Sequence, residues 1–173
     1  MPGTVIGVNM NQGYPGSYAR NPDDVVASRR VTTAGFAPGA PVVLNADNTY
    51  SAFLAAGTFA TFAGFATREV KTNTTFPALL TEAAYAVGDV ADVLERGNII
   101  VTVTRGTPTA GGAVYVRTVL GVVPDAGAVV GGIEAAAPAD GGTSIQLTNC
   151  AFVTGTLSEN GSCEVCVMTR NRP

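Results

Sequence analysis

The side chains best suited to chemistry in this sequence are two pairs of carboxylates. Asp24 follows Asp23 directly, and Asp92 follows Asp89 after two residues. Paired carboxylates hydrolyse glycosides or hold a hard cation where a fold brings them together. A sugar site also needs an aromatic platform, and the sequence has no tryptophan. We therefore interpret the four aspartates as solvated charges in turns.

A second candidate is Cys163-Glu164-Val165-Cys166, a CxxC motif near the end of the chain. A zinc site needs a second ligand pair, and Cys150 is the one other thiol in the sequence. Redox CxxC motifs open a helix, whereas this one lies in a predicted strand, where residues three apart point to opposite faces. We predict ordinary strand cysteines, and a hairpin register that does not pair Cys150 with Cys163.

The sequence contains no histidine, which removes the Ser-His-Asp and Cys-His nucleophile systems and the commonest metal ligand. The glycine pairs at 111–112, 131–132 and 141–142 lack the phosphate-loop pattern and are interpreted as turns. Glu95, Arg96, Arg105 and Arg117 serve either interfaces or solvated positions. We predict no enzymatic activity, no catalytic residue, no metal and no cofactor.

The composition favours a protein that buries surface in an assembly. Charged residues make up 13% of the 173 residues, against a typical value of about 25%, and hydrophobic residues make up 46%. The net charge of −3 argues against a nucleic-acid partner or a basic membrane surface. The N-terminal residues lack the pattern of a signal peptide, and we expect synthesis in a host cytoplasm.

Short β-signals separated by turns position these residues. Strands are expected at Val31–Phe36, Val42–Leu44, Tyr50–Leu54, Phe59–Thr67, Val90–Leu94, Asn98–Arg105, Ala113–Val119 and Val129–Ile133, with a turn at Arg96-Gly97-Asn98 and a helical turn at Pro77–Ala84. Residues 143–170 predict a C-terminal hairpin, with Glu159-Asn160-Gly161-Ser162 as its turn. Gly64 predicts a close backbone approach. The expected fold is all-β, an antiparallel jelly-roll-like sandwich or barrel.

Residues 1–30 form a separate region in this prediction, and residues 31–173 form a single β-domain. The first segment is rich in Gly, Pro and Asn, has no period of 2 or 3.6, and is expected to be an extended arm that becomes ordered on a partner surface. Its predicted contact residues are Tyr14, Tyr18, Arg20, Arg29 and Arg30.

Several segments resemble the cement, or capsid decoration, proteins of tailed bacteriophages. They are GYPGSYARNPDDVVASRRV, GAPVVLNADN, FAGFATREVKT, YAVGDVADVLERGNIIVTV and GTPTAGGAVYVRT, spanning roughly residues 13–118. The resemblance implies a jelly-roll-like β-fold and a virion protein on the outer face of the assembled capsid, where it staples neighbouring major capsid subunits. It also implies self-association as a trimer or dimer at capsid symmetry axes.

Two other functional hypotheses are compatible with the sequence. One is another phage head or tail component, such as a head-fibre base, a tail-tube protein or a completion protein. The other is a carbohydrate-binding or hydrolytic β-sandwich, which the absence of tryptophan and histidine disfavours.

Overall fold

Strand β5 (Val90–Arg105) is the element to which four other strands attach. The computed structural model describes residues 14–68, 84–155 and 161–171. Within these residues β5 pairs with β1 (Tyr18–Arg30), β4 (Phe62–Ala66), β7 (Ile133–Glu134) and β9 (Ser162–Val167). Because β5 is long and rich in β-branched residues, its two halves can pair with two different groups of strands within one continuous sheet.

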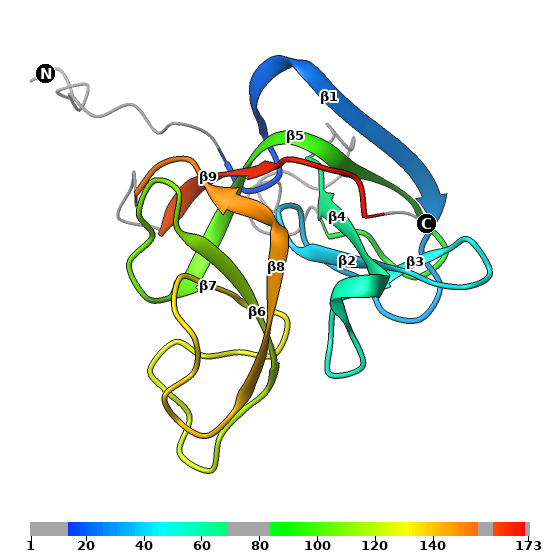
Figure 1. Ribbon diagram of the computed structural model, residues 1–173. Coiled ribbons are helices and arrows are strands. Elements are labelled where there is room, and N and C mark those ends of the chain that lie inside the picture. Colours follow the sequence, from blue (N-terminus) through cyan, green and yellow to red (C-terminus); the bar gives the residue numbers. More distant parts are fainter. Residues whose placement is uncertain (1–13, 69–83, 156–160, 172–173) are drawn as a thin grey trace, which may run out of the picture.

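The C-terminal half of β5 belongs to a closed barrel. The order runs β5–β7–β6 (Ala113–Val119)–β8 (Thr143–Phe152)–β9, and β9 returns to β5. These pairs are antiparallel apart from β5–β7 (Figure 1). The predicted all-β barrel or sandwich is confirmed, as is the antiparallel pairing of the C-terminal hairpin, in which Cys150 lies opposite Val167.

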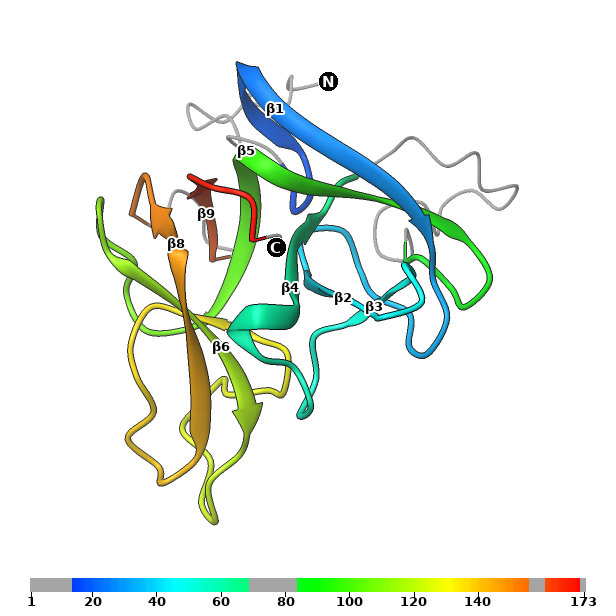
Figure 2. The ribbon, with the colours of Figure 1, turned by 45° about the vertical axis from the view of Figure 1, so that its right-hand side comes forward.

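The N-terminal half of β5 belongs to a second lobe. There β1 covers one edge of β5, and β4 pairs with β2 (Pro41–Leu44), which forms a hairpin with β3 (Tyr50–Ala52). A bridge between Val31 and Tyr50 ties the residue after β1 to β3. A 3₁₀ turn, η1 (Phe59–Thr61), leads into β4. Figure 2 shows β2, β3 and β4 beside the barrel, with β1 arching over β5.

Each lobe has its own core, because successive residues of β4 and β5 point to opposite faces. Phe65 and Leu94 face the barrel core, whereas Ala66 and Val93 face the second core. Phe62 packs edge-on against Phe65 with ring centroids 5.3 Å apart. The larger fully buried side chains of the barrel core are Phe53, Phe62, Phe65, Leu94, Ile99, Leu147 and Phe152.

Gly64 sits where two backbones meet, as predicted. A methyl group on its Cα would lie 2.0 Å from the carbonyl oxygen of Leu94, so no larger residue fits without moving β4 away from β5.

The expected turn at Arg96-Gly97-Asn98 is wrong, since β5 continues through these residues. Gly97 instead accommodates an irregularity in β1. Its φ is +122°, and a Cβ there would lie 2.0 Å from Oδ1 of Asp24. The β1–β5 register shifts between Arg20 and Val25, directly opposite this glycine. The glycine marks a close approach of β1 rather than a chain reversal.

Three further expectations differ from the structure. Residues 18–30 of the expected arm are β1, ordered on β5 of the same chain rather than on a partner. Val31–Phe36 makes isolated bridges instead of a strand, and in place of a strand at Val129–Ile133 only the two residues of β7 pair. Of the expected helical turn, residues 77–83 lie outside the described part of the chain.

Candidate interaction surfaces

Two of the predicted contact residues are exposed, Tyr14 (53%) four residues before β1 and Tyr18 (44%) at its first position. The guanidinium of Arg68 lies over the ring of Tyr14, 5.7 Å from its centroid. Nε of Arg68 also donates a hydrogen bond of 3.1 Å to the carbonyl of Pro15. Among the described residues, Arg68 thus supports one side of Tyr14, and the ring remains about half exposed, as aromatic anchors at interfaces are before they bind.

The three predicted arginines have different surroundings. Arg30 is exposed at the end of β1. The backbone of Arg20 pairs opposite Asn98, and its side chain lies outside the described part of the structure. Arg29 is turned inward, and its guanidinium lies 3.1 Å from the carboxylate of Glu95 and 5.0 Å from the ring centroid of Tyr50. Arg29 therefore holds β1 to its own lobe.

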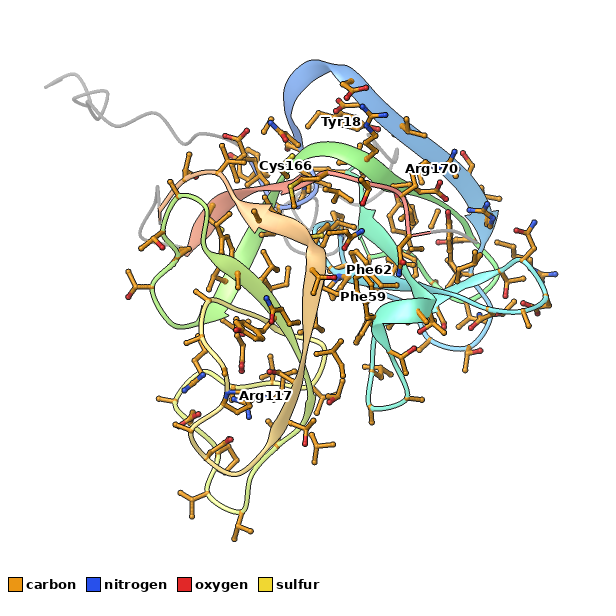
Figure 3. All side chains as sticks on the ribbon, viewed as in Figure 1. Tyr18, Phe59, Phe62, Arg117, Cys166 and Arg170 are labelled. Atoms are coloured by element: carbon orange, nitrogen blue, oxygen red, sulfur yellow. The ribbon has the colours of Figure 1, made fainter. Side chains whose placement is uncertain are left out.

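Glu95 is the meeting point of β1 and the C-terminal segment. Its side chain is 2% exposed, and Nε of Arg170 donates to its Oε2 at 2.9 Å. The next residue, Asn171, donates from its side-chain amide to the carbonyls of Phe59 and Phe62. Figure 3 shows Arg170 and the two phenylalanines near the junction of the lobes. The segment after β9 thus ties the barrel to the second lobe.

Arg117 is completely buried at the other end of the molecule (Figure 3). Its Nε donates to Oε1 of Glu134 at 2.8 Å, and an NH1 hydrogen points to Oδ1 of Asp140 at 2.7 Å. Desolvation lowers the pKa of Arg117, but the hydrogen bonds and charges of Glu134 and Asp140 outweigh it and raise the pKa above its ordinary value. The guanidinium is charged, and this pairing is a buried salt bridge.

Asp140 turns this salt bridge into a clamp for the long β6–β7 and β7–β8 connections. It accepts hydrogen bonds from the backbone N–H groups of Gly121, Asp125 and Gly142 at 2.9 to 3.3 Å. Desolvation alone would raise the pKa of Asp140, but the bonds from Arg117 and these N–H groups lower it well below its ordinary value. Side chains rather than strand pairing therefore order this glycine-rich region.

Arg105, at the end of β5, joins the same cluster from the barrel side. Its guanidinium lies 2.9 Å from the carboxylate of Asp125 and donates to the carbonyls of Ala136 and Ala137 at 3.1 and 3.0 Å. The open alternatives for Arg105 and Arg117, interface or solvated position, are thus both wrong, because these side chains bind within the chain.

The valine loop, which we define as residues 119–130, is the segment that Asp140 holds through the N–H groups of Gly121 and Asp125. Val122 is fully exposed, at 101%, and Val123 is 79% exposed. The loop contains one charged residue, Asp125, which is turned inward toward Arg105 and Arg117. The exposed aliphatic residues of the loop are Val119, Leu120, Val122, Val123, Val129 and Val130. Exposed apolar side chains gathered on one loop are a common feature of association sites.

This surface was not predicted, because residues 121–142 have the glycine-, alanine- and proline-rich sequence of an irregular loop. The available signal was a run of aliphatic residues beside two arginines and three acids in a region otherwise free of charge. Few charges in such a region indicate that the acids pair with the arginines of the flanking strands, which leaves the aliphatic side chains of the loop exposed.

A pocket of about 290 Å³ lies between the two lobes. Apolar residues and glycines dominate its lining, and Arg68 is its one charged group. Its lining residues are Pro15, Ala37, Pro38, Gly39, Ala40, Pro41, Arg68, Thr102, Thr104, Gly131, Gly132 and Ile133.

The cysteines have the character of strand residues. All three are free thiols, and burial raises the pKa of Cys163 to about 12. Cys163 is fully buried, whereas Cys166 is partly exposed, as expected for residues three apart on a strand. Among the described residues no three His, Cys, Asp or Glu side chains are placed to hold a metal ion.

The aspartates differ from one another in their surroundings. Asp23 is solvated and pairs with Arg96 at 2.5 Å, and Asp89 accepts the N–H of Ala86 at 3.0 Å. Asp92 accepts a hydrogen bond from Ser28. The carboxylate oxygens of Asp24 are buried beside β5, where the backbone N–H of Asn98 only partly offsets the loss of water. Burial therefore raises the pKa of Asp24, and for this residue the solvated prediction is wrong.

Comparisons with known proteins identify the family to which this chain belongs. The sequence model of the XM1 gp53 minor capsid protein family matches residues 3–165, so the chain belongs to this family. A solved chain from the capsid of Myoviridae phage XM1 has the same fold, with a TM-score of 0.67 over 99% of this chain and 100% of that chain, at 20% identity. Comparison with curated proteins gives no match.

The protein is therefore a minor capsid protein of a phage, a structural part of the virion that associates with other capsid proteins. Family membership points to a structural rather than an enzymatic role. No helix in the described ranges is long and apolar enough to cross a membrane.

Proposed function

We propose that this minor capsid protein is a cement protein, which binds the outer face of the assembled capsid and joins neighbouring major capsid subunits. The observation that carries the proposal is the combination of a minor capsid family with exposed tyrosine and arginine side chains along β1, a long strand that is paired with β5. A surface of this length can span the boundary between two subunits, which is what joining them requires.

The exposed side of β1, with Tyr18 at its start and Arg30 at its end, forms with the preceding Tyr14 the surface that we assign to the capsid shell. Tyrosine and arginine are enriched at the centres of protein interfaces, because each combines a large contact area with a polar group. Tyr14 is already supported by Arg68, so little side-chain entropy is lost when it binds. Arg20, two residues after Tyr18 in β1, is included in this proposed surface by its position in the chain alone.

The mechanism is thermodynamic linkage. A protein that binds the assembled shell but not its separate subunits stabilises the shell by mass action. Many copies on a symmetric lattice add modest individual contacts into a large total. Catalysis has no part in this role.

The test is the binding of purified protein to capsid shells that lack it. We expect saturable co-sedimentation at a number of copies that scales with the number of capsid subunits, and a higher melting temperature of the loaded shells. Tyr14→Ala/Tyr18→Ala should bind more weakly, whereas Leu54→Ala, another exposed apolar position on a different element, should bind like the wild type. Absence of binding to complete shells would refute the proposal.

A second candidate is a head or tail component present in few copies, such as a completion protein. Family membership alone is compatible with it. The same experiment separates the two, because saturation at a few copies per particle indicates the second role.

A further inference from the structure

We propose that the outer edge of β1 receives an extended segment of another capsid protein, which pairs with it as an added strand. The inference rests on the proposed function and deepens it, because it names how the surface along β1 holds the shell. The main chain of β1 supplies hydrogen bonds for this contact, in addition to the side chains of Tyr14 and Tyr18.

The first argument is the direction of the main-chain groups in β1. The N–H of Val31 donates to the carbonyl of Asp89 at 2.8 Å, and from there the pairing runs back without a shift to Val26 opposite Leu94. In an antiparallel ladder every second residue turns its N–H and C=O toward the partner strand. Counting back from Val31, the odd-numbered residues of this stretch therefore bond to β5. The groups that point away from β5 belong to Val26, Ser28 and Arg30.

The second argument is that this edge is open. Within the part of the chain that the structure describes, β5 is the strand that pairs with β1. Two residues after β1 ends, the N–H of Thr32 donates to the carbonyl of Tyr50 at 3.0 Å, so the same edge is already used by β3 there. Both ribbon views show β1 as the outermost labelled strand on its side of the molecule (Figures 1 and 2). The outward groups between Val26 and Arg30 thus remain available to a partner.

The third argument is that this stretch lacks the usual protection of an edge strand. Free edges are ordinarily blocked by proline, by bulges or by charge, which prevents unwanted pairing. In β1 the proline, Pro22, and the register shifts all lie before the regular stretch that begins at Val26. The inward charge of this stretch, Arg29, is paired with Glu95, and its exposed charge, Arg30, lies at its end. A regular and accessible edge is what strand addition requires.

The fourth argument is the side chains along the edge, and it selects the partner. Val26, Ser28 and Arg30 are exposed, so an added strand meets an apolar, a small polar and a cationic position in this order. A second copy of this strand is a poor match, because full antiparallel overlap of two outward edges places Val26 opposite Arg30. A segment with an aliphatic residue opposite Val26 and a carboxylate opposite Arg30 forms favourable cross-strand pairs instead. Since the family is one of minor capsid proteins, a segment of another capsid protein is the partner we assign.

The test compares Ser28→Pro with Ser28→Ala in binding to capsid shells that lack the protein. Both variants lose the hydrogen bond from Ser28 to Asp92, but proline also removes an N–H that points away from β5 and blocks the edge with its ring. The bonds from β1 to β5 come from the neighbouring residues and are kept in both variants. We expect Ser28→Ala to bind like the wild type and Ser28→Pro to bind at least about tenfold more weakly. Circular dichroism checks that each variant is folded.

Hydrogen exchange of the wild type, followed by mass spectrometry at residue resolution, gives a readout that needs no variant. In the free protein, the N–H groups of Val26, Ser28 and Arg30 should exchange faster than those of Ala27 and Arg29, which bond to β5. On the shell, the exchange of the three outward N–H groups should slow by at least about tenfold, because the added strand accepts their hydrogen bonds. This measurement decides the question if Ser28→Pro does not fold.

The outcomes separate this inference from the proposed function. If the wild type binds shells but folded Ser28→Pro binds equally well, or the outward N–H groups still exchange fast on the shell, the inference is overturned and the cement function stands. Slow exchange of these groups in the free protein means that the chain itself or a second copy fills the edge, which also overturns the inference. A wild type that does not bind shells refutes both.

Discussion

Replacing Arg117 by methionine should cause a large loss of stability. The methionine fills most of the volume of the arginine but removes a guanidinium that is 0% exposed and lies 2.8 Å from Glu134 and 2.7 Å from Asp140. The two carboxylates, at 0% and 1% exposure, would lose their buried partner. Breaking a buried ion pair by removing one partner costs about 3–5 kcal/mol. This is a large part of the 5–15 kcal/mol of a typical domain.

Urea unfolding followed by far-ultraviolet circular dichroism measures this loss. The matched control is Arg96→Met, since Arg96 pairs with Asp23 on the surface, where the side chains are 45% and 67% exposed and the pair is worth about 0–1 kcal/mol. A triple variant, Arg117→Met/Glu134→Gln/Asp140→Asn, should recover part of the loss, because it leaves no unpaired buried charge. If Arg117→Met loses less than about 1 kcal/mol, the clamp is not what orders the valine loop.

Four further outcomes follow from single contacts. Gly64→Ala should lose about 1–3 kcal/mol in urea unfolding, because the added methyl group meets the carbonyl of Leu94. Asp24→Asn should stabilise the protein at pH 7, because burial raises the pKa of this carboxyl, and the gain should shrink as pH falls through the raised pKa toward about 4, where the wild-type group is protonated. Asp140 has a lowered pKa, so its stabilisation is present above pH about 4 and is lost as pH falls further; Asp140→Asn should flatten the acid side of the stability profile. Arg170→Ala should lose about 1 kcal/mol and show faster amide exchange after β9, since this arginine is partly exposed.

The strands and turns with strong local signals were predictable from the sequence. The β2–β3 hairpin, β6 and the C-terminal hairpin follow from β-branched runs bounded by turn residues. The close approach at Gly64 was predictable because a glycine inside a strand of aromatic residues often marks a place where another backbone comes near.

Long-range pairing was not predictable in the same way. Gly97 inside a β-branched run has the local signature of a turn, yet it accommodates β1, which lies more than sixty residues earlier in the chain. The segment of β1 was read as an arm because Pro22 and the two aspartates interrupt its period. In the structure these residues fall where the register shifts, so the interruption is local and β5 supplies the missing order.

The candidate surfaces were predictable in part. Tyr14 and Tyr18 are exposed as expected, but Arg29 is bound to Glu95, a partner that no local pattern reveals. The valine loop depends on the pairing of Arg117 with Asp140, a contact that only the folded chain brings about.

An icosahedral reconstruction of shells loaded with this protein tests the central claim most directly. The account predicts density for the two-lobed body on the outer face, with Tyr14, Tyr18 and the exposed side of β1 contacting at least two major capsid subunits. Density on the inner face, contact with a single subunit, or a location confined to one vertex would contradict it.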